Sequence, residues 1–128
     1  MIFLERAVVI AMHDHQLAVH GGAAGIRDSG LLDSALARPQ NKFAYGETDP
    51  HQLAAAYAYG IARNHPFIDA NKRTGLFAAL LFMRLNRIAM PLPSPEMVEQ
   101  MVQLAEGLLD EAGFATWLAA QPVRTASR

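Results

Sequence analysis

The sequence contains no cysteine, almost no net charge and no long apolar run, and each absence excludes a class of protein. Without cysteine there is no disulfide framework and no thiolate metal site, which suits a reducing cytoplasm. A formal charge of −1 argues against a broad electrostatic surface for nucleic acid, so any phosphate-binding site must be local. The longest apolar run, residues 75–83, is about half of what a bilayer crossing needs.

Length and composition favour one compact domain. The chain has 128 residues, of which 52% are hydrophobic, and this is enough to bury a single core. The N-terminal stretch carries charged residues and no basic leader, so we expect that it is not a signal peptide. We therefore expect a soluble cytoplasmic protein with one domain over residues 1–122 and a frayed tail over residues 123–128.

Helix signals follow one another along the chain, and no convincing alternating strand pattern competes with them. The predicted fold class is therefore all-α, with about six helices around a buried central helix. The expected helices are residues 3–19, ended by Gly21 and Gly22; 31–38, closed by Pro39; 50–64, after Asp49; 71–86; one that begins at Ser94 and ends at Gly107; and a last one that contains Phe114 and Trp117. Residues 42–45 or residues 88–92 could pair as a minor hairpin.

Two of these helices carry predictions about burial. In the first, Leu4, Val8 and Met12 lie near one face, so we expect that face to be buried. Residues 71–86 are apolar on nearly every side, and such a helix belongs in the middle of a core. The sequence therefore predicts that residues 71–86 form the central helix.

The most informative run is HPFIDANKRTG, residues 65–75, between the end of one helix and the start of the central helix. Lys72 and Arg73 occupy the first turn, where the helix dipole is positive and disfavours cations. Together with the free backbone N–H groups at that end, these cations would bind phosphate oxygens, and Asn71 could add a donor. We therefore expect a polyphosphate ligand.

Two side chains in the same run suit catalysis. Asp69 is its only carboxylate and could hold Mg²⁺ beside bound phosphates, although it could also serve only as an N-cap. His65 could take a proton from an attacking hydroxyl, or it could be only a structural cap beside Pro66. Phe67 and Ile68 are interpreted as core anchors that fix the loop.

Several other polar residues receive no role. His13 and His15 are two positions apart, so on a helix they point in different directions and make a poor metal pair. Residues 21–25, GGAAG, lack the lysine of a phosphate-binding loop and indicate a turn. Arg27 and Arg63 could contact a ligand or a partner, but their spacing assigns them nothing.

Residues 65–73 match the motif of the Fic/Doc family at every position: His, any, Phe, any, Asp or Asn, Ala or Gly, Asn, Lys or Gly, Arg. The stretch from Gly21 to Gln40, the helix rich in Ala and Tyr before His65, and the region around Glu106 also resemble the death-on-curing (Doc) toxins of this family. The resemblance thus covers nearly the whole chain. It implies an all-α fold.

The resemblance also implies a role for each residue of the run. His65 would be the base that activates a target hydroxyl, and Asp69 would hold Mg²⁺. Asn71, Lys72 and Arg73 would bind the phosphates of ATP. These implied roles agree with the chemistry expected from the residues themselves.

Departures from the AMP-transferring members of the family bear on the reaction. Those members have Gly where this chain has Lys72, and a second Arg where it has Leu76. The resemblance to Doc then implies a protein kinase that transfers the terminal phosphate of ATP. Its implied target is a threonine of elongation factor Tu, whose phosphorylation arrests translation. An AMP transferase of the same fold is the nearest alternative.

Control by a second chain is also implied. Many family members carry an inhibitory helix with Ser or Thr, three residues, Glu, then Gly or Asn. Here Glu106 and Gly107 follow Val102, so the motif is absent. The resemblance implies a Phd-like antitoxin that inhibits in trans and links the protein to DNA only indirectly. The alternative of another class is an inactive co-repressor module that only binds the antitoxin.

Overall fold

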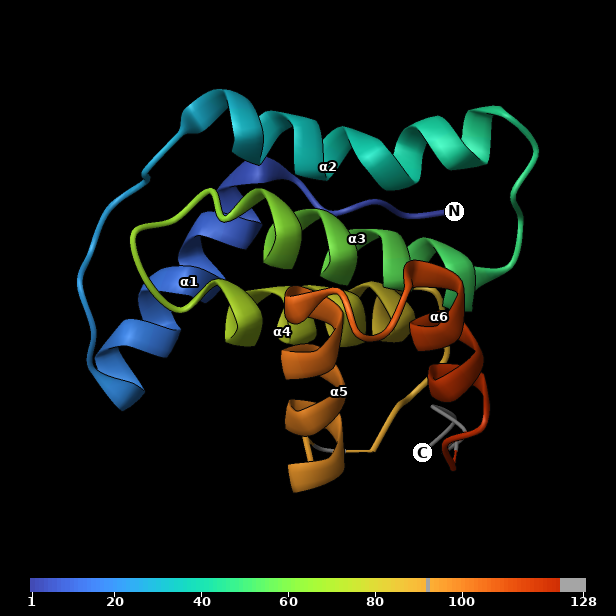
Figure 1. Ribbon diagram of the computed structural model, residues 1–128. Helices are drawn as coiled ribbons and strands as arrows, with labels where there is room; N and C mark the ends of the chain where they lie inside the picture. Colours follow the sequence, from blue (N-terminus) through green and yellow to red (C-terminus); the bar gives the residue numbers. More distant parts are fainter. Residues whose placement is uncertain (92, 123–128) are drawn as a thin grey trace.

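The computed structural model describes residues 1–91 and 93–122, and this part of the chain is built from helices (Figure 1). The elements are α1 (Arg6–His20), α2 (Ser29–Ala44), α3 (Pro50–Asn64), α4 (Asn71–Leu85), α5 (Pro95–Glu106) and α6 (Glu111–Ala119). The predicted all-α class with six helices is confirmed for the described residues. Within them, no helix combines the length and the apolar character that crossing a membrane requires. The expected frayed tail, residues 123–128, lies outside the described part.

Helix α3 is the centre of the fold. It lies between α2 and α4, and α5 and α6 also pack against it (Figure 1). Its sequence allows this because small residues let neighbouring helices approach closely. A Cβ atom added at Gly60 would lie 3.1 Å from Ala35 Cα on α2, and one added at Gly75 of α4 would lie 3.2 Å from the Ala58 carbonyl oxygen of α3.

The prediction that residues 71–86 form the central helix is therefore wrong. Helix α4 packs against α3, α1 and α5, but Leu80 and Leu81 are only half-buried and Leu85 is exposed. The large apolar side chains of α4 suggested that other helices surround it on all sides. It is α3 that other helices surround, because its small side chains let them approach closely, although such side chains carry little hydrophobic signal in the sequence.

The helix ends follow the capping signals closely. Asp49 accepts from the backbone N–H of His51, and Ser94 accepts from that of Met97. Gly107 ends α5 in the left-handed region with a φ of 81°. The expected boundaries of α3 and α5 are confirmed, because each depends on local side chain to backbone bonds.

Helix α2 does not stop at Pro39, as the sequence predicted. It continues to Ala44, with Pro39 buried inside it. Proline removes one helical hydrogen bond, but packing against α3 and the anchoring of the last turns compensate for that loss. The strand suggested for residues 42–45 is also wrong, since residues 42–44 belong to this helix. Of the suggested segment 88–92, residue 92 lies outside the described residues.

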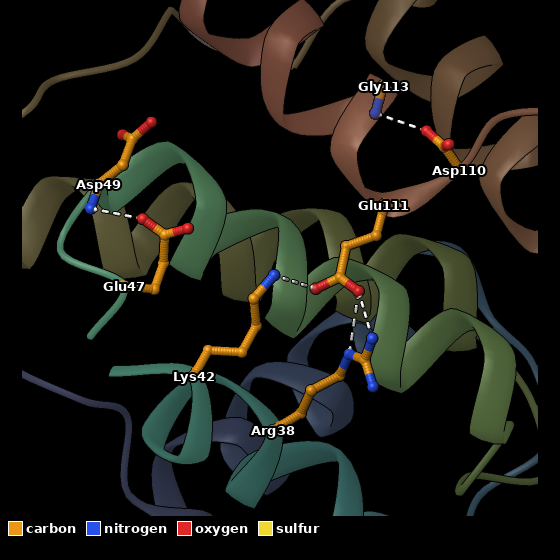
Figure 2. Close-up of polar contacts among 7 residues, drawn as sticks. All are labelled: Arg38, Lys42, Glu47, Asp49, Asp110, Glu111 and Gly113. Carbon is orange, nitrogen blue, oxygen red and sulfur yellow. Dashed lines mark hydrogen bonds and ion pairs between the residues drawn. The ribbon is translucent and has the colours of Figure 1, made fainter. Parts of the chain in front are cut away.

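The last turns of α2 are anchored to α6 by charge. Arg38 and Lys42 both contact the carboxylate of Glu111, at the start of α6, and the Lys42 Nζ to Glu111 Oε2 distance is 3.0 Å (Figure 2). The hydrogen bond with Glu111 raises the pKa of Arg38 above its ordinary value. Both cations are thus already paired with a carboxylate within the fold.

The buried face of α1 also differs from the prediction. The helix begins at Arg6, and Leu4 is buried ahead of it, in an extended segment whose backbone N–H donates to the Tyr57 hydroxyl. Val8 is exposed and Met12 only half-buried. The buried residues of α1 are Val9, His13 and Gln16. Because two of these three are polar, the apolar pattern pointed to the wrong face.

We expect Gly60→Ala to lower the free energy of unfolding by about 1–3 kcal/mol, because the added methyl meets backbone atoms of α2 that cannot move aside cheaply. Urea unfolding followed by Trp117 fluorescence measures this. Gly30→Ala is the matched control, since the only neighbour of its Cβ is Asp28 Oδ1 at 3.4 Å. Equal stability of the two variants would refute the close approach of α2 and α3.

Candidate active site

The chain reverses between α3 and α4 through two residues in the left-handed region. His65 ends α3 with φ 54° and ψ 53°, and Ala70 precedes α4 with φ 62° and ψ 27°. Neither is glycine, so each costs about 1–3 kcal/mol that surrounding contacts must offset. The following Pro66 contributes to the unusual conformation of His65, because a proline disfavours the right-handed helical region for the residue before it.

The reversal opens onto a hollow of about 240 Å³ that contains the predicted site residues. It is lined by Gly21, His65, Asp69, Ala70, Asn71, Lys72 and Arg73. At the start of α4, the backbone N–H groups of Asn71, Lys72 and Arg73 have no acceptor among the described residues. Free N–H groups at the positive end of a helix dipole form a site for an anion.

Lys72 and Arg73 strengthen this anion site. Both are exposed, and no carboxylate in the described part of the chain forms an ion pair with either. Two unpaired cations in the first helical turn are unfavourable by themselves, because the dipole is positive there. An anion bound at the N–H groups would relieve that repulsion.

A larger hollow, of about 670 Å³, lies elsewhere, between the last turns of α2 and the loop that follows. Its cations, Arg38 and Lys42, are both paired with the carboxylate of Glu111 (Figure 2), and Glu47 also lines it. Neither cation is unpaired as the two at the start of α4 are, so the larger size does not make this hollow the better phosphate site. The smaller hollow is therefore the candidate active site.

The side chain of Asn71 turns inward. It is 3% exposed, its Oδ1 accepts from the Phe67 N–H at 2.9 Å, and its Nδ2 donates to the Phe67 carbonyl at 2.9 Å. Nδ2 also lies 3.1 Å from His65 Nδ1. The side chain that the sequence offered as a phosphate donor is thus occupied within the loop, and only the backbone N–H of Asn71 remains for a ligand.

This arrangement also orients the imidazole of His65. Because Asn71 Oδ1 accepts from a backbone N–H, its Nδ2 must be the donor to His65 Nδ1. The neutral ring then carries its proton on Nε2. The exposed ring stands at the wall of the hollow.

Asp69 holds two backbone segments together. Its Oδ1 accepts from the Ala70 N–H at 2.8 Å and its Oδ2 from the Ala23 N–H at 3.2 Å. The hydrogen bond from Ala70, and after it the one from Ala23, lower the pKa of the Asp69 carboxyl below its ordinary value. Gly22 is required here, since a Cβ on it would lie 2.8 Å from Asp69 Oδ2. The carboxylate is exposed, so its remaining lone pairs could bind a cation together with phosphate oxygens.

The segment 22–28 supports the site and was not predicted to do so. It lies antiparallel to residues 66–68, through an Ile26 to Phe67 bridge and two N–H groups that donate to the Pro66 carbonyl. Arg27 donates from Nε to the His65 carbonyl at 2.7 Å and from Nη2 to the Asn64 carbonyl at 2.9 Å. Arg27 thus caps the negative end of α3.

Arg63, Ile68 and His13 have contacts or exposure that the sequence did not predict. Arg63 donates to the Ala105 carbonyl at 3.0 Å, so it binds α5. Phe67 is fully buried and is a core anchor as predicted, whereas Ile68 is 50% exposed and is not. His13, which received no role, donates from Nε2 to the Asp69 carbonyl at 2.9 Å.

Comparison with known proteins agrees with this geometry. The profile of the Fic/DOC family matches residues 3–83, which include the whole hollow. The chain belongs to the Fic/DOC family. Among Fic/DOC proteins, the chain is 39% identical to "Protein kinase doc" of Escherichia phage P1 over 86% of this chain and 87% of that protein. It is 45% identical to "Toxin Doc" of Mycolicibacterium smegmatis over 53% of this chain and 54% of that protein.

We expect Asp69→Asn to destabilise the protein only where the wild-type carboxyl is ionised. Because the folded pKa is lowered, the contribution of Asp69 is fully present above the ordinary pKa of about 3.9 and is lost as the pH falls through the lower folded value. Urea unfolding of both proteins should show a stability gap at neutral pH that closes in acid. A gap that persists unchanged in acid would show that these N–H bonds do not stabilise the carboxylate.

Proposed function

We propose that this chain is the toxin of a toxin–antitoxin pair and a protein kinase that transfers the terminal phosphate of ATP to a protein hydroxyl. The observation that supports this proposal most strongly is the hollow, where free N–H groups, two unpaired cations, a carboxylate and an imidazole converge. The names of the two relatives, a protein kinase and a toxin, support this reading. It also accords with the expected location in the cytoplasm.

The phosphates of ATP would occupy the start of α4. The N–H groups of Asn71, Lys72 and Arg73 and the two cationic side chains bind their oxygens. Asp69 would hold Mg²⁺, which in proteins is commonly bound by one or two carboxylates together with substrate phosphates. When bound, the ion neutralises developing charge on the phosphate oxygens.

His65 would receive the proton of the target hydroxyl. The hydroxyl oxygen forms a bond to the terminal phosphorus, the bond from that phosphorus to the bridging oxygen breaks, and ADP leaves with that oxygen. The lone pair of His65 Nδ1 accepts from Asn71, so uptake of the proton at this nitrogen requires the hydroxyl to displace that contact. Asn71 keeps its bonds to Phe67 and thereby holds the loop.

Leu76 favours phosphoryl transfer over AMP transfer. It is 2% exposed and packs in the core, at the position where the AMP-transferring pattern has a second Arg. Lys72 instead adds an exposed cation at the first turn. The phosphate chain would therefore be held from the first turn of α4, with no cation one turn further along.

We further propose a threonine of elongation factor Tu as the target and a Phd-like antitoxin as the inhibitor. The absence of the inhibitory motif around Glu106 supports control by a separate chain. Any DNA contact would then belong to the antitoxin.

We predict that incubation of elongation factor Tu with this protein, Mg²⁺ and ATP adds about 80 Da per target, one phosphoryl group. His65→Ala should abolish the gain, whereas His15→Ala, which changes an exposed histidine outside the hollow, should keep it. Intact-mass spectrometry measures all three. A gain of about 329 Da would indicate AMP transfer instead. A gain that survives in His65→Ala would disprove the role of His65.

We expect Gly22→Ala to weaken binding of Mg²⁺ and ATP by about tenfold or more, because its Cβ displaces the carboxylate of Asp69. Gly46→Ala is the matched control, because Gly46 lies outside the small hollow. Gly46 has a φ of 108°, close to the 125° of Gly22, but its Cβ would meet nothing within 4 Å. Titration calorimetry on both variants measures the difference. Equal losses would mean that backbone strain, and not Asp69, is responsible.

A further inference from the structure

His13 is the most deeply buried titratable side chain near the hollow, and the proposed transfer does not use it. It is 1% exposed and its ring stacks on Phe67, with centroids 3.8 Å apart and planes 9° apart. Its Nε2 lies 2.9 Å from the Asp69 carbonyl oxygen. A carbonyl can only accept, so Nε2 carries a hydrogen and donates it.

Among the described residues, the other ring nitrogen makes no comparable contact. His13 Nδ1 lies 3.7 Å from Asp14 Oδ1, beyond hydrogen-bond distance, and the Asp14 side chain is 69% exposed. The well-formed polar contact of this buried ring is therefore directed at the backbone of Asp69. A side chain that only filled the core would need no such donor.

The peptide unit between Asp69 and Ala70 is held at both ends. Its C=O accepts from His13, and its N–H donates to the Asp69 carboxylate. The following residue, Ala70, has a φ of 62°. A flip of this peptide would bring Ala70 to a negative φ, which alanine prefers, so these two bonds act directly against the flip.

We propose that His13 is a positioning residue that holds the Asp69–Ala70 peptide in its strained orientation, and thereby aims the Asp69 carboxylate and the first N–H groups of α4 into the hollow. It touches neither the nucleotide nor the target. Its effect on transfer rests on the proposed function, but its effect on the loop does not.

The test separates the two contacts of the ring. His13→Phe keeps an aromatic ring against Phe67 but removes the donor, and His13→Gln supplies an N–H donor without the ring. The first readout is the sign of φ at Ala70, from NMR chemical shifts and scalar couplings of the protein without ligand. The second is the affinity for Mg²⁺ with a non-hydrolysable ATP analogue, from titration calorimetry.

We expect His13→Phe to give a negative φ at Ala70 and a loss of affinity of about 10- to 100-fold, while His13→Gln keeps the positive φ and most of the affinity. Urea unfolding checks that both variants fold. If His13→Phe does not, His13→Leu replaces it as the variant without a donor.

A double variant distinguishes positioning from core packing. Glycine tolerates a positive φ, so His13→Phe with Ala70→Gly should recover part of the affinity that His13→Phe loses. No recovery, or an unchanged φ and affinity in His13→Phe, overturns the proposal. If the wild type transfers no phosphate, the proposed function fails, and the φ of Ala70 still decides the role of His13.

Discussion

Two helices that pack side by side must be joined by a reversal of the chain, and between α3 and α4 that reversal is residues 65–70. Phe67 anchors it in the core, and the side chain of Asn71 binds both the N–H and the carbonyl of Phe67. The reversal is rigid for this reason. The fixed course of the chain through this reversal leaves the first N–H groups of α4 facing the hollow, with His65 and Asp69 beside them.

The N-terminal third of the chain supplies the external support. Segment 22–28 pairs with the reversal, Arg27 holds the carbonyl groups at the end of α3, and His13 holds that of Asp69. Strain at two left-handed residues is thus offset by contacts from residues far away in the sequence. The geometry of the candidate site therefore depends on contacts from α1 and the loop after it.

Capping signals such as Asp49, Ser94 and Gly107 gave accurate helix ends, because they depend on bonds within a few residues. The predicted end of α2 at Pro39 was wrong because tertiary packing extends the helix past this residue. The predicted buried face of α1 was wrong because His13 and Gln16 are buried. The five residues that the sequence proposed for the site all line one hollow, because they lie within the single run 65–73. The inward turn of Asn71 and the supports from His13 and Arg27 could not be predicted, because they depend on how distant segments meet.

The most direct test of the phosphate site is a ¹H–¹⁵N NMR titration with Mg²⁺ and a non-hydrolysable ATP analogue. We predict that the backbone amides of Asn71, Lys72 and Arg73 shift most, because they donate to the phosphates. Largest shifts around Arg38 and Lys42, at the bigger hollow, would refute the phosphate site at the start of α4.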